Sequence, residues 1–228
     1  MINYRPDIVQ GSDEWHAARC GLLTASEMHL IVTPTMKAAS NDKERAHLYE
    51  LLAQRITKYV EPSYISDAML RGMDDEIEAL ARYGKTYAPV QAVGFITNDK
   101  WGFTIGYSPD ALVGEDGQVE CKSRSQKYQL RTLCEYVPAG KIDPDFMIQV
   151  QTGLLVSERE WCDLVSYCGG LQMATVRVLP DKDVQAAILA AAEAFEKRLA
   201  EKRAQYESVI ASGARLVNTV RKIREEMI

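Results

Sequence analysis

The sequence has few residues of the kinds that build zinc or iron–sulfur sites. Among 228 residues there are three histidines and five cysteines, namely Cys20, Cys121, Cys134, Cys162 and Cys168. The cysteines are odd in number, widely spread and without a C-x-x-C pair, which argues against a disulfide framework and gives no sign of a metal–thiolate site. We expect most cysteines to be small core residues and the histidines to have packing or surface roles.

Long apolar runs are also missing. No run approaches the roughly 18 residues needed to cross a bilayer. The first ten residues, MINYRPDIVQ, have neither a basic start nor an apolar signal core. We therefore expect a cytoplasmic protein without a membrane partner.

An excess of positive charge is absent too, because the formal net charge is -5. A protein that coats nucleic acid nonspecifically needs clustered Lys and Arg, so this class is disfavoured. One local basic patch is formed by Lys122, Arg124, Lys127 and Arg131, with no acid between its ends. The patch fits contacts to DNA or an ordinary solvated helix face, and by itself it favours neither.

The hydrophobic residues, 46% of the chain, are mixed throughout, which predicts one domain over residues 1–228. We expect its core at about 10–180 and a helical C-terminal extension at 181–228. Capping residues and periodicity predict helices at 12–20, from 24 onward, and at 42–57, 66–83, 126–135, 143–156 and beyond 180, the last one broken at Gly213. Strands are expected between 92 and 122, at 161–168 and at 172–179. The fold class is α/β (α+β).

The segment with the clearest chemistry holds Asp110, Glu120 and Lys122. Alternation along a strand sends Glu120 and Lys122 to one face, and a hairpin would bring Asp110 beside them. Magnesium prefers oxygen ligands and is usually held by one or two carboxylates plus substrate phosphate. The three side chains therefore predict a metal-assisted phosphodiesterase site, although a surface hairpin with incidental charges would show the same pattern.

Glu76 is a candidate for a further metal ligand. On the expected helix 66–83, an apolar stripe runs through Met69, Met73, Ile77 and Leu80. Glu76 lies roughly 60° from the centre of this stripe, whereas Asp74, Asp75 and Glu78 point away. A half-buried carboxylate needs a metal or a basic partner, so a salt bridge to an arginine is the alternative.

Arg19 and Ser26 form a candidate phosphate site. Arg19 is expected to end one helix just before Ser26 enters the first turn of the next, where free backbone N–H groups favour an anion. Arginine adds a bidentate contact to phosphate that lysine does not match. Alternatively, Arg19 only caps its own helix and Ser26 only begins one.

These residues resemble a known family. The sequence is similar to the phage lambda-type exonucleases, or YqaJ-like viral recombinases, of the PD-(D/E)xK nuclease superfamily. The resemblance covers about residues 10–156 and rests on ordered blocks: W-H-x-x-R-x-G-x-x-T-A-S-E at 15–27, G-x-x-x-E at 72–76, S-P-D at 108–110, E-x-K at 120–122 and Q-V-Q at 149–151.

The resemblance implies a central mixed β-sheet flanked by helices, with a restriction-endonuclease-like core. It also implies a site with two Mg²⁺ ions, for which Mn²⁺ would substitute. The implied ligands are Asp110, Glu120, Glu76 and the Cys121 backbone carbonyl. Lys122 would act on the attacking water and Gln149 would be a further polar group of the site.

The implied activity is 5′→3′ digestion of one strand of linear double-stranded DNA from 5′-phosphorylated ends. Arg19 and Ser26 match the family's 5′-phosphate ligands, and we add Ser108, Arg124, Lys127 and Arg131 as candidate DNA contacts. The implied assembly is a homotrimeric ring that works with a single-strand annealing protein in phage recombination, inside a bacterial host. Such a ring would reconcile an acidic chain with DNA affinity.

The sequence departs from the family pattern at Ala111 and Ser123, and its tail beyond Pro180 has no matching motif. These departures leave the chemistry intact but bear on DNA-end geometry and subunit contacts. Two alternatives remain: a site- or structure-specific endonuclease with the same metal centre, and a non-catalytic DNA-binding or assembly protein.

Overall fold

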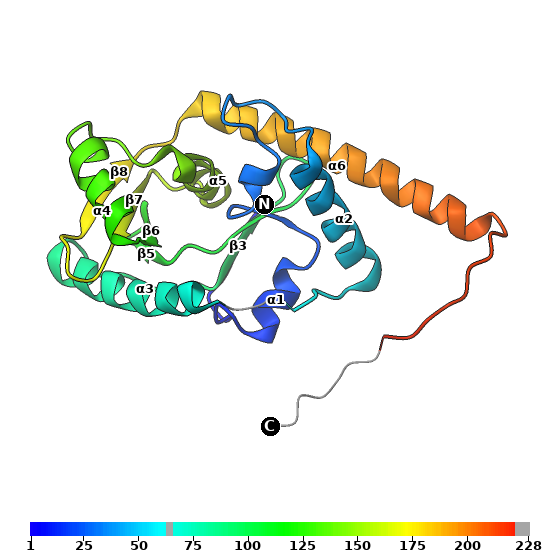
Figure 1. The fold of residues 1–228 in the computed structure, drawn as a ribbon, viewed down its shortest axis with the longest axis horizontal. Helices are drawn as coiled ribbons and strands as arrows, with labels where there is room; N and C mark the ends of the chain where they lie inside the picture. The colour runs from blue at the N-terminus through cyan, green and yellow to red at the C-terminus, as the bar shows by residue number, and fades with distance from the viewer. Residues whose placement is uncertain (63–65, 222–228) are drawn as a thin grey trace, which may run out of the picture.

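The protein is built on two four-stranded mixed sheets flanked by helices, where the sequence suggested one central sheet (Figure 1). This computed structural model describes residues 1–62 and 66–221. Its α/β class agrees with the sequence-based expectation. The residues at 92–122 do form strands, but the first two of these strands belong to one sheet and the last two to the other.

The first sheet has the order β1-β3-β4-β2. Its strands are β1 (Ile2–Arg5), β2 (Leu23–Thr24), β3 (Phe95–Asn98) and β4 (Ile105–Tyr107). Strands β3 and β4 are antiparallel neighbours, and β2 runs parallel to β4 with Thr24 opposite Gly106. This pairing brings the N-terminal segment beside the strand that leads into the S-P-D motif.

The second sheet has the order β5-β6-β7-β8. Its strands are β5 (Ala111–Val113), β6 (Gly117–Ser123), β7 (Trp161–Tyr167) and β8 (Ala174–Val178). The hairpin β5–β6 pairs Ala111 with Val119, as the sequence predicted, and β6 runs parallel to β7. Since β5 is short, no strand among the described residues pairs with β6 on that side from Glu120 onward.

The N-terminal segment departs from expectation after its first helix. Helix α1 (Asp13–Arg19) starts at Ser12, whose side chain caps Trp15 N–H as predicted. The helix expected from residue 24 is wrong: Thr24 lies in β2, and only the 3₁₀ turn η1 (Met28–Leu30) follows. The Thr24 hydroxyl donates to the Glu27 carboxylate at 2.7 Å instead of capping a helix. Ser26 therefore does not lie in the first turn of an α-helix.

Helix α3 (Asp67–Thr86) is capped by Ser66, the residue predicted to open it. The helix continues through Gly84, where the sequence predicted its end. The predicted apolar stripe is not the buried face, because Met69, Met73 and Ile77 are 47%, 51% and 70% exposed. The helix instead packs on the second sheet through Ala79 and Tyr83, which share a cluster of buried side chains with β5, β6 and β7.

The remaining helices surround the two sheets (Figure 1). Helix α2 (Asp42–Thr57) matches its predicted bounds. The segment predicted as one helix at 126–135 is α4 (Gln126–Arg131) followed by the π-helical η2 (Thr132–Tyr136). After the 3₁₀ turn η3 (Pro144–Phe146), helix α5 (Met147–Ser157) packs against β3, β4 and β7 and is almost entirely buried.

The chain ends with the long helix α6 (Lys182–Ala211). Its N-terminal part, as far as Leu199, packs on α2 and α5 through Ile188, Phe195 and Leu199, while its C-terminal end projects beyond the body (Figure 1). Gly213 follows the end of this helix, and residues 214–221 are not helical, in contrast to the prediction. Within the described residues, no helix combines the length and apolar character that a membrane span requires.

Candidate active site

The S-P-D motif lies at the crossing between the two sheets. Strand β4 ends at Tyr107 and β5 begins at Ala111, so Asp110 lies immediately before the hairpin. Its Oδ2 accepts a hydrogen bond from the Cys121 backbone N–H at 2.5 Å. Because the N–H and C=O of one strand residue point to the same side, the Cys121 carbonyl also faces the open edge beside Asp110.

Glu120 and Lys122 lie on the same face of β6, as the alternation predicted, and α5 supplies Gln149 to that face. The Lys122 ammonium donates to Glu120 Oε1 at 2.8 Å and to Gln149 Oε1 at 2.9 Å. Gln149 Nε2 donates to the same Glu120 oxygen at 2.5 Å. These contacts close a small polar triangle, which brings Gln149 together with two residues nearly 30 positions earlier in the chain.

Glu76 faces this cluster from α3. Burial raises the pKa of Glu76, and the nearby negative charge of Glu120 raises it further. The neighbouring Asp75 also faces the second sheet, since its carboxylate accepts from the Ser123 hydroxyl at 2.5 Å. The expectation that Asp75 points away is therefore wrong, because the packed face of α3 is the one that carries Ala79 and Tyr83.

The electrostatics of the cluster fit a hard divalent cation. Asp110 is half-buried, and burial followed by the charges of Glu120 and Glu76 raises its pKa well above the usual range. Burial lowers the pKa of Lys122, but its neighbours, Glu120 first and then Asp110, together raise the pKa above its usual value, so that the ammonium stays charged. One ammonium does not balance three carboxylates held this close, whereas oxygen ligands of this kind are those that Mg²⁺ takes.

Arg19, Ser26 and Ser108 come together beside the cluster. The Arg19 guanidinium donates to Ser26 Oγ at 3.3 Å and to Thr24 Oγ1 at 3.1 Å. It lies over the Trp15 ring, 4.3 Å from the centroid, and the Trp15 indole N–H donates to Ser108 Oγ at 2.7 Å. A guanidinium and hydroxyl groups thus converge two residues from Asp110, a composition that suits a phosphate group.

Trp15 and Thr24 were not singled out as site residues from the sequence, although both contact Arg19. The signal available was the spacing of Trp15 and Arg19, which are four residues apart and so share one face of α1. Gly21 shapes the turn behind the pocket with φ +74°, and a Cβ there would lie 2.7 Å from Cγ of Arg55. Arg55 in turn donates to the Gly21 carbonyl and pairs with Glu196 of α6.

The basic patch is divided in the structure. Arg124 is half-buried, pairs with Asp143 at 2.6 Å and lies over the Phe146 ring. Lys127 and Arg131 lie on the exposed surface of α4, where Arg131 pairs with Glu135 at 3.2 Å. The structure does not bring these two residues into the carboxylate cluster.

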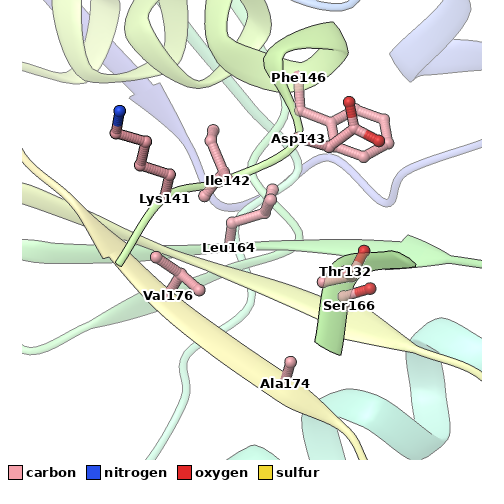
Figure 2. Close-up of a pocket in the computed structure, with 9 residues that line it drawn as sticks. All are labelled: Thr132, Lys141, Ile142, Asp143, Phe146, Leu164, Ser166, Ala174 and Val176. Atoms are coloured by element: carbon pink, nitrogen blue, oxygen red, sulfur yellow. The ribbon is translucent and has the colours of Figure 1, made fainter. Parts of the chain in front are cut away.

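A cavity beside Asp143 and Phe146 is too small for a substrate (Figure 2). Its volume is about 10 Å³, and most of its lining comes from apolar side chains such as Leu164 and Val176. That volume is about the minimum for a single water molecule. The cavity is therefore a packing feature between η3 and strands β7 and β8.

A second group with metal-ligand composition lies near the pocket and consists of Glu27, His47 and Glu50. His47 Nδ1 lies 3.3 Å from the Glu50 carboxylate, and its buried Nε2 has no hydrogen-bond partner within the part of the chain that the structure describes. If Nδ1 bound a metal, Nε2 would carry a proton, and this buried N–H would have no acceptor. A metal-bound histidine usually donates its other ring N–H to an acceptor. In the tautomer whose Nδ1–H donates to Glu50, the buried Nε2 is an acceptor without a hydrogen, so no N–H donor is left unpaired.

Comparison with solved structures places this architecture among exonucleases. LHK-Exo, an alkaline exonuclease from Laribacter hongkongensis, is 31% identical with a TM-score of 0.77 over 89% of this chain and 100% of its own. Its complex with dAMP gives 32% identity and a TM-score of 0.74 over 88% of this chain and 98% of its own. A phage-related exonuclease from Haemophilus somnus 129PT shares the fold. It is 12% identical, with a TM-score of 0.53 over 79% of this chain and 96% of its own.

The family model of the YqaJ-like viral recombinase domain matches residues 14–160, which is more than half of the chain. No curated protein matches the sequence. The chain belongs to the YqaJ-like viral recombinase family, as its motifs suggested, and its structural neighbours are alkaline exonucleases of the lambda exonuclease type. Family and neighbours together support a nuclease of the phage exonuclease kind.

Proposed function

We propose that the protein is a magnesium-dependent 5′→3′ exonuclease that degrades one strand of linear double-stranded DNA from 5′-phosphorylated ends. The observation that carries the proposal is that two groups of side chains adjoin: Ser108, which shares Trp15 with Arg19, lies two residues before Asp110 of the carboxylate cluster. An end phosphate held in this pocket would place the first phosphodiester bond near the cluster.

Asp110, Glu120, Glu76 and the Cys121 carbonyl would hold two Mg²⁺ ions, or Mn²⁺ in their place. A divalent cation at such a site lowers the pKa of water and neutralises charge on the phosphate. The residues themselves supply the oxygen ligands and their fixed positions. Asp110 is anchored by Cys121 N–H, and Glu120 by Lys122 and Gln149.

Lys122 would orient the attacking water and stabilise charge that develops on the phosphate. Its ammonium keeps its proton in the present surroundings because Glu120 raises its pKa. A fixed positive charge in a site of low dielectric lowers the energy of an anionic transition state more than it does in water. Gln149 would hold Lys122 in place through the 2.9 Å hydrogen bond.

The phosphate pocket would select the end of the strand. Arg19 is rigidly placed, since it lies over Trp15 and donates to two hydroxyl groups. Its ion pair with Glu27 is long, at 4.0 Å, so a phosphate would meet a guanidinium that is only partly neutralised. The neighbour LHK-Exo, crystallised with dAMP, is an exonuclease that accepts a mononucleotide.

The biological setting that we propose is phage recombination by single-strand annealing in the cytoplasm of a bacterial host. The protein would act as a homotrimer, with an annealing protein as its partner. A ring could carry Lys127 and Arg131 toward DNA while the net charge of the chain stays negative. Mass measurement in solution tests this part, because a trimer has three times the mass of the chain.

A gel assay on linear and covalently closed circular duplex, with and without Mg²⁺, tests the activity. The proposal predicts Mg²⁺-dependent shortening of linear DNA, faster from 5′-phosphate than from 5′-hydroxyl ends, and no attack on the circle. Cleavage of the circle would instead establish an endonuclease. If Mg²⁺ released no nucleotides from either substrate, a non-catalytic DNA-binding role would replace the proposal.

A further inference from the structure

Tyr107 is a buried group that approaches the active site from the first sheet. It ends β4, is 1% exposed and points its hydroxyl at Glu120 Oε2, 3.2 Å away. The other oxygen of the same carboxylate, Oε1, already accepts from Lys122 and Gln149. Tyr107 is therefore the contact that holds the second oxygen of Glu120.

The fold makes room for this contact at a specific place on α5. Gly153 lies inside the buried helix, and a Cβ there would be 2.6 Å from Cζ of the Tyr107 ring. Glycine in a helix interior costs about 1 kcal/mol relative to alanine, so its presence needs a local reason. Gly153 lies one helical turn after Gln149, on the same face of α5. This face therefore supplies the hydrogen-bond donor to Glu120 Oε1 and leaves room for the Tyr107 ring, whose hydroxyl reaches Oε2.

The hydroxyl is suited to a permanent donor role. The phenol O–H donates to Glu120 Oε2 at 3.2 Å. A hydrogen bond from a hydroxyl to an ionised carboxylate is stronger than one between neutral groups.

We propose that Tyr107 is a positioning residue that fixes the orientation of the Glu120 carboxylate for divalent cations. The inference rests on the proposed metal site. The terminal torsion of a glutamate side chain is broad, so a carboxylate anchored at one oxygen alone can turn. With Tyr107 on one oxygen and Lys122 with Gln149 on the other, the carboxylate is held at both ends.

The test compares Tyr107→Phe with Tyr83→Phe in the full chain, with Mg²⁺ as the probe. Tyr83 is a matched control because it is also fully buried and its hydroxyl also donates to a carboxylate, Asp163, at 2.6 Å. Loss of a group that supports a metal ligand typically weakens metal affinity about tenfold or more. Tyr107→Phe should raise the half-saturating Mg²⁺ concentration for nuclease activity and the Mg²⁺ dissociation constant by that factor.

In Tyr107→Phe, the rate at saturating Mg²⁺ should change much less than the Mg²⁺ affinity does. Tyr83→Phe should lower the unfolding temperature and leave the Mg²⁺ dependence of activity unchanged. Gly153→Ala should reproduce the Mg²⁺ shift, because its Cβ displaces the Tyr107 ring. Wild-type Mg²⁺ affinity in Tyr107→Phe would overturn the inference. In that case Glu120→Gln separates the two claims. If Glu120→Gln also binds Mg²⁺ with wild-type affinity, the proposed metal site fails. If Glu120→Gln binds Mg²⁺ more weakly, only the role of Tyr107 fails.

Discussion

The Arg19 guanidinium lies over the Trp15 indole ring, 4.3 Å from its centroid, and the same indole donates its N–H to Ser108. One aromatic side chain therefore positions two candidate phosphate contacts from different parts of the chain. This arrangement needs the planar cation of arginine, because stacking and a bidentate contact are both lost with lysine.

Arg19→Lys should reduce the preference for 5′-phosphate over 5′-hydroxyl ends by about tenfold or more, since a charge-assisted hydrogen bond contributes about 1.5–3 kcal/mol. The measurement is the ratio of initial rates on the two linear substrates. Arg203→Lys, on the exposed part of α6, is the matched control and should keep the wild-type ratio. An unchanged ratio in Arg19→Lys would remove Arg19 from end recognition.

Lys122→Met should lower the turnover number by about 10²-fold or more, because it deletes a preorganised charge beside the scissile bond. The methionine keeps most of the side-chain volume, so the protein should remain folded by circular dichroism. Lys202→Met removes an exposed ammonium that donates to Gln205 and should have wild-type activity. Full activity in Lys122→Met would contradict the mechanism proposed for this residue.

Without divalent metal, the free energy of unfolding should fall as the pH rises from acid toward neutral. The folded chain raises the pKa of Asp110 and Glu76, chiefly through burial. Below the ordinary carboxyl pKa, the folded and the unfolded chain both hold these protons. Above it, the unfolded chain releases protons that the folded chain keeps, so the free energy of unfolding falls. The fall ends when the pH passes the raised pKa of the folded chain.

Thermal unfolding in EDTA at a series of pH values measures this loss. Added Mg²⁺ should stabilise the protein increasingly as the pH rises, because the cation competes with protons for the same oxygens. Asp110→Asn should flatten the metal-free pH profile. A wild-type profile in that variant would show that Asp110 is not a source of the pH dependence.

Gly21→Ala should destabilise the protein by about 1–3 kcal/mol, because alanine at positive φ is strained and its Cβ would collide with Arg55. Denaturant unfolding gives the change. Gly102→Ala is an informative control, since its φ is also positive at +84° but no atom lies within 4 Å of the added Cβ. Equal losses in the two variants would mean that backbone strain alone, without the Arg55 contact, sets the cost.

The sequence predicted the centre of the site better than its surroundings. Strand alternation and a short turn sufficed for Glu120, Lys122 and Asp110, because those contacts are local. Tyr107 and Trp15 were missed because their partners are set by packing between sheets and helices. No local pattern distinguishes such a residue from an ordinary core aromatic.

The prediction for α3 placed Glu76 on the inward side of the helix by an incomplete argument. Glu76 does face the cluster, yet the apolar stripe used to orient it is largely exposed. Periodicity gives the hydrophobic side of a helix but not which side meets the sheet. The small Ala79 and the large Tyr83, four residues apart, were the better sign of the packed face.

Titration of the protein with Mn²⁺ by calorimetry tests the central claim most directly, since it counts ions and measures their affinity. The account predicts two ions per chain in the wild type and a loss of both affinity and stoichiometry in Asp110→Asn. If Asp110→Asn bound as many ions with the same affinity as the wild type, the carboxylates of Asp110, Glu120 and Glu76 would not form the metal centre.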